Sequence, residues 1–498
     1  MMFAAPIPPR GTSLRCIMDV EVAGKPIPSS SYEMSVMPEL GDSHPGTPAT
    51  SLSAQSSIAA LRAADPQEGA NVQELPPVDR GFGAWMFCAS AFITEMMIWG
   101  FSFSYGIFQE YYTSHPPFSS ASTVSIAAVG TVSLAFLYGE NFFLFFFVGR
   151  YPDFLRVSMW VGLGIYFVSL FASSFATQVW QLILLQGAGV GIGGGIVYLP
   201  IIKLLPEWFS ERRGLASGLI FSGTALGGFV FPLLLNALLT NIGLRWTLRL
   251  WAIGTTVLCG IAMLGMRSRL PVPKYSAVHR RPKLLPGRVD FLRSTLFWSV
   301  AITNMLQGLS YFPVSLYIAT FTKGLSNQLT ATSILSLFNV SAVVGQITIG
   351  HLSDRFPYPM IMLFSAVGSG LGAFLLWGFA DKVVYLYFFA FIFGSLSGGF
   401  SSTWTNSAAE CAGSKPEFIG LAFCGVSFVK GISAVIGPVI SGFLLQAGKG
   451  STMGHGFGRF GYGAVEIFVG SCAFACGVGS IVIALARKQR VEILAPVF

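Results

Sequence analysis

Long apolar runs separated by short polar stretches dominate the chain from residue 85 onward. A helix crosses the apolar core of a bilayer with roughly 20 residues, and twelve runs come close to that length. They cover residues 85–108, 122–148, 157–175, 179–204, 213–239, 247–266, 296–320, 329–349, 359–379, 383–408, 418–446 and 462–486. Runs such as "FFLFFFVG" do not alternate between apolar and polar residues, which argues against a barrel of membrane strands. The pattern predicts an all-α membrane protein with twelve transmembrane helices.

Two stretches lack a long apolar run. The first, residues 1–78, is rich in Ser, Pro, Ala and Gly, a composition typical of a disordered tail. The second, residues 267–295, is basic and separates the apolar runs into two sets of six. We therefore expect a disordered cytoplasmic tail at 1–78, a six-helix bundle at 79–266, a basic linker at 267–295, a second six-helix bundle at 296–486 and a short tail at 487–498.

Composition supports a membrane setting. Hydrophobic residues make up 53% of the chain and charged residues only 10%, whereas a soluble domain carries roughly 25% charged residues. The seven cysteines are scattered, nearly all within apolar runs, without the spacing of a disulfide framework or a zinc site. We expect these cysteines to pack as small apolar residues, and we expect no metal.

Basic residues gather in alternate connections between the apolar runs. Those connections and the end of the chain contain Arg150, Arg156, Arg212, Arg213, Arg267, Arg269, Lys274, Arg280, Arg281, Lys283, Arg288, Arg293, Arg355, Lys415, Arg487, Lys488 and Arg490. Loops rich in Lys and Arg stay in the cytoplasm, so we expect both termini there. The net charge of +8 then reflects topology and not nucleic-acid binding. The expected location is the cell membrane, with a vacuolar or other internal membrane as the alternative.

The two halves repeat one another weakly. The turn "GRYPDF" (149–154) matches "GHLSDRFPYP" (350–359), and "WFSERRGLASG" (208–218) takes the position of 407–425. A Gly-rich stretch with a proline follows in both halves. Matches at equivalent positions indicate an internal repeat of the kind that many transporters contain.

With these turns in view, the chain resembles the major facilitator superfamily, whose loop motif of Gly and Asp-Arg is similar to "GHLSDR". It resembles the monocarboxylate-porter branch more closely, and its fungal members above all, in "DRGFGAW" (79–85), "YGIFQEYY" (105–112), 208–228 and 339–355. The similarity spans roughly residues 79–487. It implies a transporter that works by alternating access.

The resemblance also implies a gate of charged residues at the cytoplasmic loops. Asp354 and Arg355, next to Gly350, would cap helix ends and pair across the gap between helices; the alternative is a topology anchor within a turn that prolines fix. Weaker counterparts are Arg150 and Asp153 in the first half. The turn with Glu207, Glu211, Arg212 and Arg213 is open between a gate and a solvated turn.

Departures from the branch bear on the substrate. Gln346 stands where the branch usually has a cationic residue, and Ala342 stands where some animal members have an Asp. The lysine that animal members carry in the first helix has no counterpart in 85–108. We therefore do not expect proton symport of a small carboxylate such as lactate.

Glu95, Glu140 and Lys430 are ionisable residues that lie within the apolar runs. Each costs at least about 2.5 kcal/mol at mid-bilayer and should face a cavity or a partner. We expect Glu95 and Lys430 to contact substrate or proton, with a structural pair between helices as the alternative. Glu140 lies nearer the cytoplasmic end, where a capping or gate role is favoured.

In the superfamily, helices 1, 4, 7 and 10 line the cavity. Here they offer aromatic and neutral polar side chains, which suit stacking and hydrogen bonding to a bulky solute of low charge. The candidates for substrate or proton binding, with two from helix 8, are Tyr105, Gln109, Tyr198, Asn304, Gln307, Tyr311, Asn339, Gln346, Trp404, Thr405 and Asn406.

Three classes of function come into question for such a chain: an enzyme, a nutrient sensor and a transporter. No Walker, HExxH or GxSxG motif and no His cluster is present, so we expect neither an enzyme nor a cofactor. A nutrient sensor that has lost transport is less favoured. We expect a monomeric secondary active transporter of an organic small molecule, with the bilayer as its surroundings and a proton as its coupling ion. Efflux of a fungal secondary metabolite is favoured, and uptake of a monocarboxylate or related nutrient is the alternative.

Overall fold

The computed structural model describes residues 75–271, 275, 281–284, 289–448 and 457–494. The tail expected at 1–78 lies outside the described residues except for 75–78. The same holds for residues 272–274, 276–280 and 285–288 of the basic linker and for 495–498 of the C-terminal tail.

Every regular element in the described part of the chain is a helix. The first half comprises α2 (Gly81–Phe103), α3 (Tyr105–Ser114), α4 (Thr123–Arg150), η1 (Pro152–Phe154), α5 (Leu155–Ser173), α6 (Val179–Leu182), η2 (Ile183–Gly189), α7 (Val190–Trp208) and α8 (Arg213–Gly265). The second half comprises η3 (Asp290–Arg293), α9 (Thr295–Leu325), α10 (Gln328–Ser353), α11 (Tyr358–Leu371), η4 (Gly372–Trp377), α12 (Val383–Gly399), η5 (Phe400–Thr403), α13 (Trp404–Ala412), η6 (Pro416–Phe418), α14 (Ile419–Gly448), η7 (Arg459–Gly461) and α15 (Gly463–Leu494).

Each of the twelve apolar runs falls on a helix. Among the described residues, ten helical stretches are long and apolar enough to cross a membrane. One of them is α8, whose 53 residues are interrupted at Gly243, where φ is +75°. Because glycine tolerates this left-handed backbone, α8 supplies two of the predicted helices. α9 has 31 residues and is more polar than the ten. The expected all-α membrane fold is confirmed.

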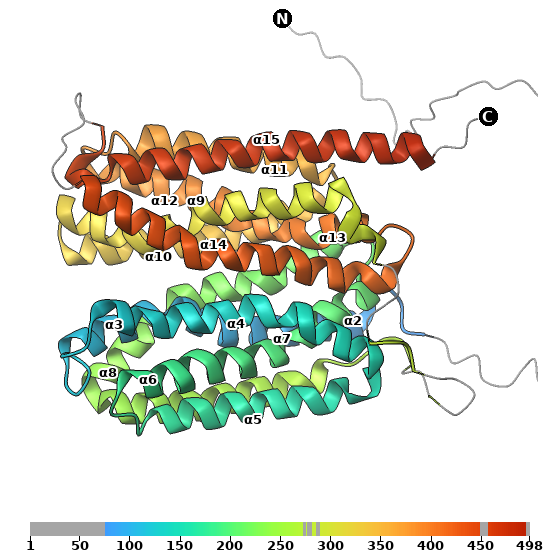
Figure 1. The fold of residues 1–498 in the computed structure, drawn as a ribbon, viewed down its shortest axis with the longest axis horizontal. Coiled ribbons are helices and arrows are strands. Elements are labelled where there is room, and N and C mark those ends of the chain that lie inside the picture. Colours follow the sequence, from blue (N-terminus) through green and yellow to red (C-terminus); the bar gives the residue numbers. More distant parts are fainter. Residues whose placement is uncertain (1–74, 272–274, 276–280, 285–288, 449–456, 495–498) are drawn as a thin grey trace, which may run out of the picture. The chain divides into compact units, whose positions relative to one another are not determined.

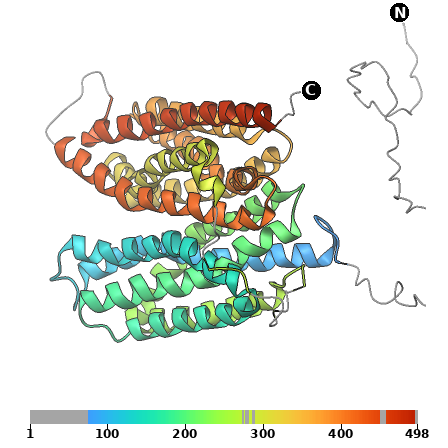
Figure 2. The ribbon, with the colours of Figure 1, turned by 45° about the vertical axis from the view of Figure 1, so that its right-hand side comes forward.

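The described helices belong to one compact unit and fall into two groups. Figure 1 shows α2 to α8 in blue and green on one side and α9 to α15 in yellow to red on the other, and the groups stay separate in the turned view of Figure 2. We call these the first and second helix groups. They meet where α8 packs on α10 and where α4 packs on α14.

Large apolar side chains cover much of the exposed surface. They occur in both helix groups and include Phe143, Val168, Ile261, Phe364, Phe443 and Val478. Water would disfavour so many exposed apolar groups, whereas lipid tails accept them. The exposed surface therefore agrees with a protein that has lipid as its solvent.

Helices α8 and α10 approach each other closely at one end of the molecule. A Cβ atom on Gly218 would collide with the carbonyl oxygen of Gln346, and one on Gly350 would collide with the carbonyl oxygen of Gly214. Small residues allow helix backbones to touch in this way. We call this end the linker end, because Arg267 and the following residues lie beside it, where the Trp208 indole donates to the Arg267 carbonyl at 2.8 Å.

Asp79 fixes the turn that leads from α7 into α8. Its side chain is buried, and its carboxylate accepts hydrogen bonds from the backbone N–H groups of Ser210 (3.0 Å), Glu211 (3.0 Å) and Arg212 (2.9 Å). Its own N–H donates to the Trp208 carbonyl at 2.9 Å. The first N–H groups of a helix and of the turn before it have no partners within the helix. Asp79 therefore sets the position at which α8 begins.

Gly218→Val should disrupt the contact between α8 and α10, because the added atoms meet backbone that has no room to move. We expect a loss of roughly 1–3 kcal/mol in the free energy of unfolding, as for other overpacked interiors. Thermal unfolding in detergent measures this loss. Gly254→Val is the matched control in the same helix, because a Cβ there meets nothing within 4 Å. Equal effects of the two substitutions would contradict the close approach.

Asp79→Ala should loosen the α7–α8 turn, because three N–H groups lose their acceptor. We expect about 1–3 kcal/mol of lost stability and faster amide hydrogen exchange at residues 210–212. Glu211→Ala serves as the control, since Glu211 is exposed and its side chain makes no hydrogen bond or ion pair with the described residues. Unchanged exchange in Asp79→Ala would refute the assignment.

Candidate functional site

Glu95 lies near the middle of α2, at its contact with α8. The residue is 4% exposed. One carboxylate oxygen accepts a hydrogen bond from the Thr224 hydroxyl at 2.8 Å, and the other oxygen has no hydrogen-bond partner among the described residues. A buried carboxyl with an unused oxygen is costly unless it serves a proton or a ligand. Glu95 is thus buried between helices, as the sequence led us to expect, and one of its carboxylate oxygens can still accept a hydrogen bond or a proton.

Lys430 lies near the middle of α14 in the second helix group and is 5% exposed. Its ammonium donates to Gln307 Oε1 at 2.7 Å. The nitrogen lies 4.5 Å from the centre of the Trp404 ring and about 6 Å from those of Tyr311 (6.0 Å) and Phe312 (5.9 Å). Among the described residues no ion pair includes Lys430 or Glu95.

Aromatic rings connect the surroundings of these two residues. Trp99 contacts Tyr138 at 4.6 Å and Tyr198 at 5.4 Å between ring centres, and Tyr138 contacts Phe312 of the second group at 6.3 Å. Tyr138 also lies against the backbone of Gly431, the residue after Lys430. We call Trp99, Tyr138, Tyr198 and Phe312 the central aromatic cluster. The cluster joins the two helix groups. It lies between the surroundings of Glu95 in the first group and those of Lys430 in the second.

A small apolar pocket adjoins this centre. Rings of Phe221 and Phe423 line the pocket and contact Trp404 at 6.2 and 5.8 Å between centres. The complete lining is Tyr198, Ile201, Ile202, Leu205, Pro206, Phe221, Thr405, Ile419, Gly420 and Phe423. Residues of both groups thus line one small concave surface.

The polar candidates of α9 lie at this centre. Gln307 donates through Nε2 to the carbonyl (2.8 Å) and hydroxyl (3.0 Å) of Ser397. Asn304 donates to the Val300 carbonyl at 2.8 Å, while its Oδ1 has no partner. Of the predicted set, Gln307, Tyr311 and Trp404 are the residues that the structure places beside the Lys430 ammonium.

Two candidates from the first apolar run lie elsewhere. Tyr105 and Gln109 belong to α3, beyond a break after α2 at Ser104. The Tyr105 hydroxyl donates to the Ile126 carbonyl, and the Gln109 side chain makes no hydrogen bond with any described residue. The sequence showed one uninterrupted run, so nothing in it marked the change of helix.

Of the other predicted residues, Asn339 joins the two groups at the α8–α10 contact, whereas Gln346 and Asn406 form hydrogen bonds within the second group. Asn339 donates to the Gly228 carbonyl of α8 at 3.1 Å. The Gln346 carbonyl accepts from the Ser402 hydroxyl at 2.8 Å, while the Gln346 side-chain oxygen has no partner. Asn406 donates to Asp354 Oδ1 at 3.2 Å. Asn339 and Asn406 are therefore engaged in contacts between helices.

Asp354 makes the main polar contact between the groups at the linker end. Its two carboxylate oxygens accept from the N–H groups of Gly214 (2.6 Å) and Leu215 (2.8 Å), in the first turn of α8. The amino end of a helix attracts negative charge. Arg355 is exposed and has no side-chain hydrogen bond or ion pair with the described residues. In this conformation the contact is made by Asp354 and not by Arg355.

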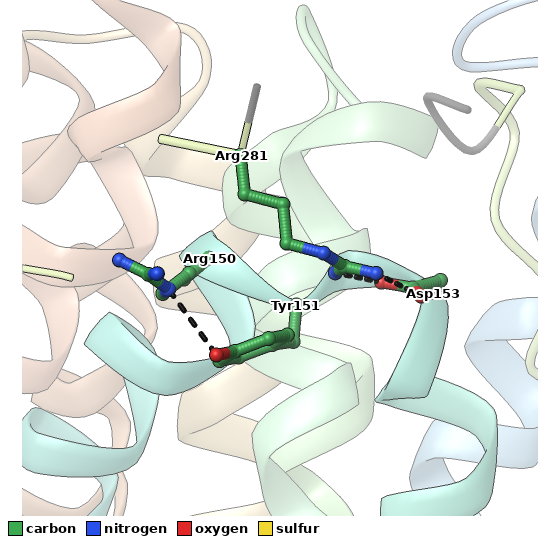
Figure 3. Close-up of polar contacts among 4 residues, drawn as sticks. All are labelled: Arg150, Tyr151, Asp153 and Arg281. Carbon is green, nitrogen blue, oxygen red and sulfur yellow. Dashed lines mark hydrogen bonds and ion pairs between the residues drawn. The ribbon is translucent and has the colours of Figure 1, made fainter. Parts of the chain in front are cut away.

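The turn after α4 contains an ion pair at the linker end, shown in Figure 3. Arg281 of the linker binds both oxygens of Asp153, at 2.7 and 2.9 Å, and lies 4.9 Å from the Tyr151 ring centre. These hydrogen bonds raise the pKa of Arg281 above its ordinary value. Arg150 donates instead to the Tyr151 hydroxyl at 3.2 Å. Arg150 also donates to the Pro282 carbonyl of the linker at 3.5 Å. Both residues of the turn therefore contact the linker, and Asp153 pairs with Arg281 and not with Arg150.

The remaining charged candidates have separate surroundings. Glu211 and Arg212 are exposed, and Arg213 donates to the Phe209 carbonyl at 3.3 Å. Glu207 accepts from the Ser268 hydroxyl at 2.7 Å. Glu140 lies against the backbone of Gly195 in α7, which gives it a contact between α4 and α7.

Sequence reasoning missed Asp79 and Ser217. The Ser217 hydroxyl lies 2.9 Å from that of Thr405, a predicted candidate in the other helix group. Asp79 precedes a helix, which would have suggested a cap for that same helix. Its actual partners lie more than 130 residues later, and no local pattern indicates them.

Comparisons with known proteins agree with this geometry. The family model described as Major Facilitator Superfamily matches residues 86–438. An MFS-type transporter of Gibberella zeae is 28% identical over 82% of this chain and 88% of its own length. The aspyridones efflux protein of Emericella nidulans is 27% identical over 80% of this chain and 78% of its own. The agnestins efflux protein of Paecilomyces divaricatus is 27% identical, with coverages of 82% and 88%.

A solved structure shows the same fold. The fucose:proton symporter of E. coli has a TM-score of 0.59 at 11% identity and covers 80% of this chain and 98% of its own. These relatives are transporters, which confirms the expectation that the chain is not an enzyme; membership of the monocarboxylate-porter branch stays a prediction. The chain belongs to the major facilitator superfamily of multi-pass membrane transporters.

Proposed function

We propose that this transporter exports an organic secondary metabolite by alternating access. The observation that carries the proposal is the centre: Glu95 and Lys430 lie in opposite helix groups, have no ion-pair partner among the described residues, and flank a cluster of rings. A solute held there would touch both groups. Relatives named as efflux proteins for aspyridones and agnestins support the direction of transport.

The Asp354 contact serves as the gate in this proposal. It closes the linker end when the helix groups approach, and it must break when residues 79–266 and 296–486 rock apart as two units. Its bonds to two N–H groups are strong enough to hold a conformation, and water replaces them when the groups separate. Asp79 does not cross the interface, but it keeps the α8 amino end in place to receive Asp354.

The linker end faces the cytoplasm in this proposal, and the protein works as a monomer in the cell membrane. The excess of Lys and Arg in the connections at that end supports the orientation. A gate at the cytoplasmic end that closes after loading fits export, because the solute then leaves from the opposite end.

Glu95 is the residue to which we assign the coupling proton. Its free oxygen can accept the proton, and the Thr224 hydroxyl holds the carboxyl in position. A proton that moves down its gradient can drive a solute outward only if the two share one conformational cycle. Glu95 meets this condition because it lies on α2 at α8, the helix that Asp354 contacts.

The test compares a deletion strain with strains that express the wild type or Glu95→Gln. We expect one product to accumulate inside deletion cells and to return to the medium with the wild type. We expect Glu95→Gln to lower efflux at least tenfold and to remove its dependence on the proton gradient, because the amide cannot carry the proton. Metabolite profiles of cells and medium measure both effects.

Glu110→Gln is the control, since Glu110 is exposed on α3. Slower growth of the deletion strain on a single carbon source, with no retained product, would contradict export and indicate uptake. Retention of the product without any change in Glu95→Gln would move the coupling proton to another residue.

A further inference from the structure

Lys430 is a buried cation without an acidic partner in the part of the chain that the structure describes. An ammonium has three donor hydrogens, and the hydrogen bond to Gln307 uses one of them. The ion pairs in the described residues involve Arg281, Lys415 and Arg487, and not Lys430. A charge removed from water needs a counter-ion or a full set of hydrogen bonds. The structure supplies Lys430 with neither.

Gln307 cannot turn away from Lys430. Its amide nitrogen donates to both the carbonyl and the hydroxyl of Ser397, so its oxygen must point to the ammonium. Gln307 therefore orients the lysine by a neutral dipole and leaves its charge uncompensated.

The surroundings of Lys430 contain a second unused donor. Trp404, whose ring centre is 4.5 Å from the ammonium nitrogen, has an indole N–H without a hydrogen-bond partner. The charged Lys430 ammonium and the Trp404 indole N–H, both with unused donor hydrogens, thus lie close together at the Trp404 ring. Their natural complement is a negatively charged hydrogen-bond acceptor.

Rings continue from this position on two sides. Phe312 leads to the central aromatic cluster, and Phe221 and Phe423 lead from Trp404 into the apolar pocket. Ring faces favour offset stacking with other planar groups. An apolar, flat molecular body would find partners here, whereas a small hydrated acid would not.

We propose that Lys430 binds the acidic group of a planar, conjugated organic anion whose apolar body stacks on Trp404 and its neighbouring rings. This inference builds on the proposed function and names the chemical class of the solute that the site carries. Lys430 is then a specificity-determining residue, and Gln307 is a positioning residue that acts through it.

The test uses two flat probes that differ in charge, 9-anthracenecarboxylate and 9-anthracenemethanol. Energy transfer from tryptophan to anthracene measures their binding to the purified full chain in detergent. We expect the wild type to bind the carboxylate roughly ten- to hundredfold more tightly, as for other hydrogen bonds between charged groups. Lys430→Gln should bind both probes alike, and Lys430→Arg should keep the preference.

Lys203→Gln is the matched control, because Lys203 is a partly buried lysine on α7 that does not line the pocket. Elution as a single species and an unchanged melting temperature show that Lys430→Gln is folded. If that variant is unfolded, the comparison of Lys430→Arg with the wild type still tests whether a cation suffices.

Equal affinity of the wild type for the two probes, the absence of saturable carboxylate binding, or a preference that survives in Lys430→Gln would overturn the acid site. These outcomes differ from failure of the proposed function. A protein with the preference that retains no product in the deletion strain would keep the acid site and lose the export role. Export by a protein that lacks the preference would keep the export role and overturn the acid site.

Discussion

The contact of the Asp354 carboxylate with the amino end of α8 is the interaction on which the relation of the two helix groups depends. It joins a negative charge to two N–H groups that have no partners within their own helix. Gly214 and Gly350 allow the backbones to come close enough for it. Asp79 supports it from within the first group by holding the turn before α8. The linker end is thus stabilised by a contact between the groups and by a contact within the first group that supports it.

The centre of the molecule follows a different physical rule. There, ionisable groups are withdrawn from water without being paired with each other, and rings occupy the space between the helix groups. Such an arrangement is unfavourable for stability alone, because buried charge is costly. It is reasonable for a protein that must bind and release a solute and a proton, since a permanent ion pair between Glu95 and Lys430 would compete with both. The polar groups at the linker end are thus strongly hydrogen-bonded, whereas the ionisable groups at the centre lack ion-pair partners among the described residues.

The sequence predicted the architecture well because the apolar runs needed only to be counted against the thickness of a bilayer. It also indicated Glu95, Lys430 and Asp354 as candidates, since charge is rare and costly within and next to such runs, and their roles stay predictions. It could not predict partners that lie far apart along the chain. Tertiary packing decides the hydrogen bonds of Asp79 to a turn far along the chain. It also decides that Asp153 pairs with Arg281 and not with Arg150. Tyr105 and Gln109 were grouped with the centre because the break at Ser104 leaves no mark in hydropathy.

The most direct test of the account is the distance between the two groups at the linker end. Spin labels at exposed Glu211 and Phe356, in a chain whose seven native cysteines are replaced, report it by pulsed electron resonance. We predict one short distance in the parent and an added longer distance in Asp354→Asn, because the loss of charged hydrogen bonds shifts the equilibrium about tenfold or more. Glu417→Gln, an exposed control, should leave the distribution unchanged. The same distribution in Asp354→Asn as in the parent would contradict the account.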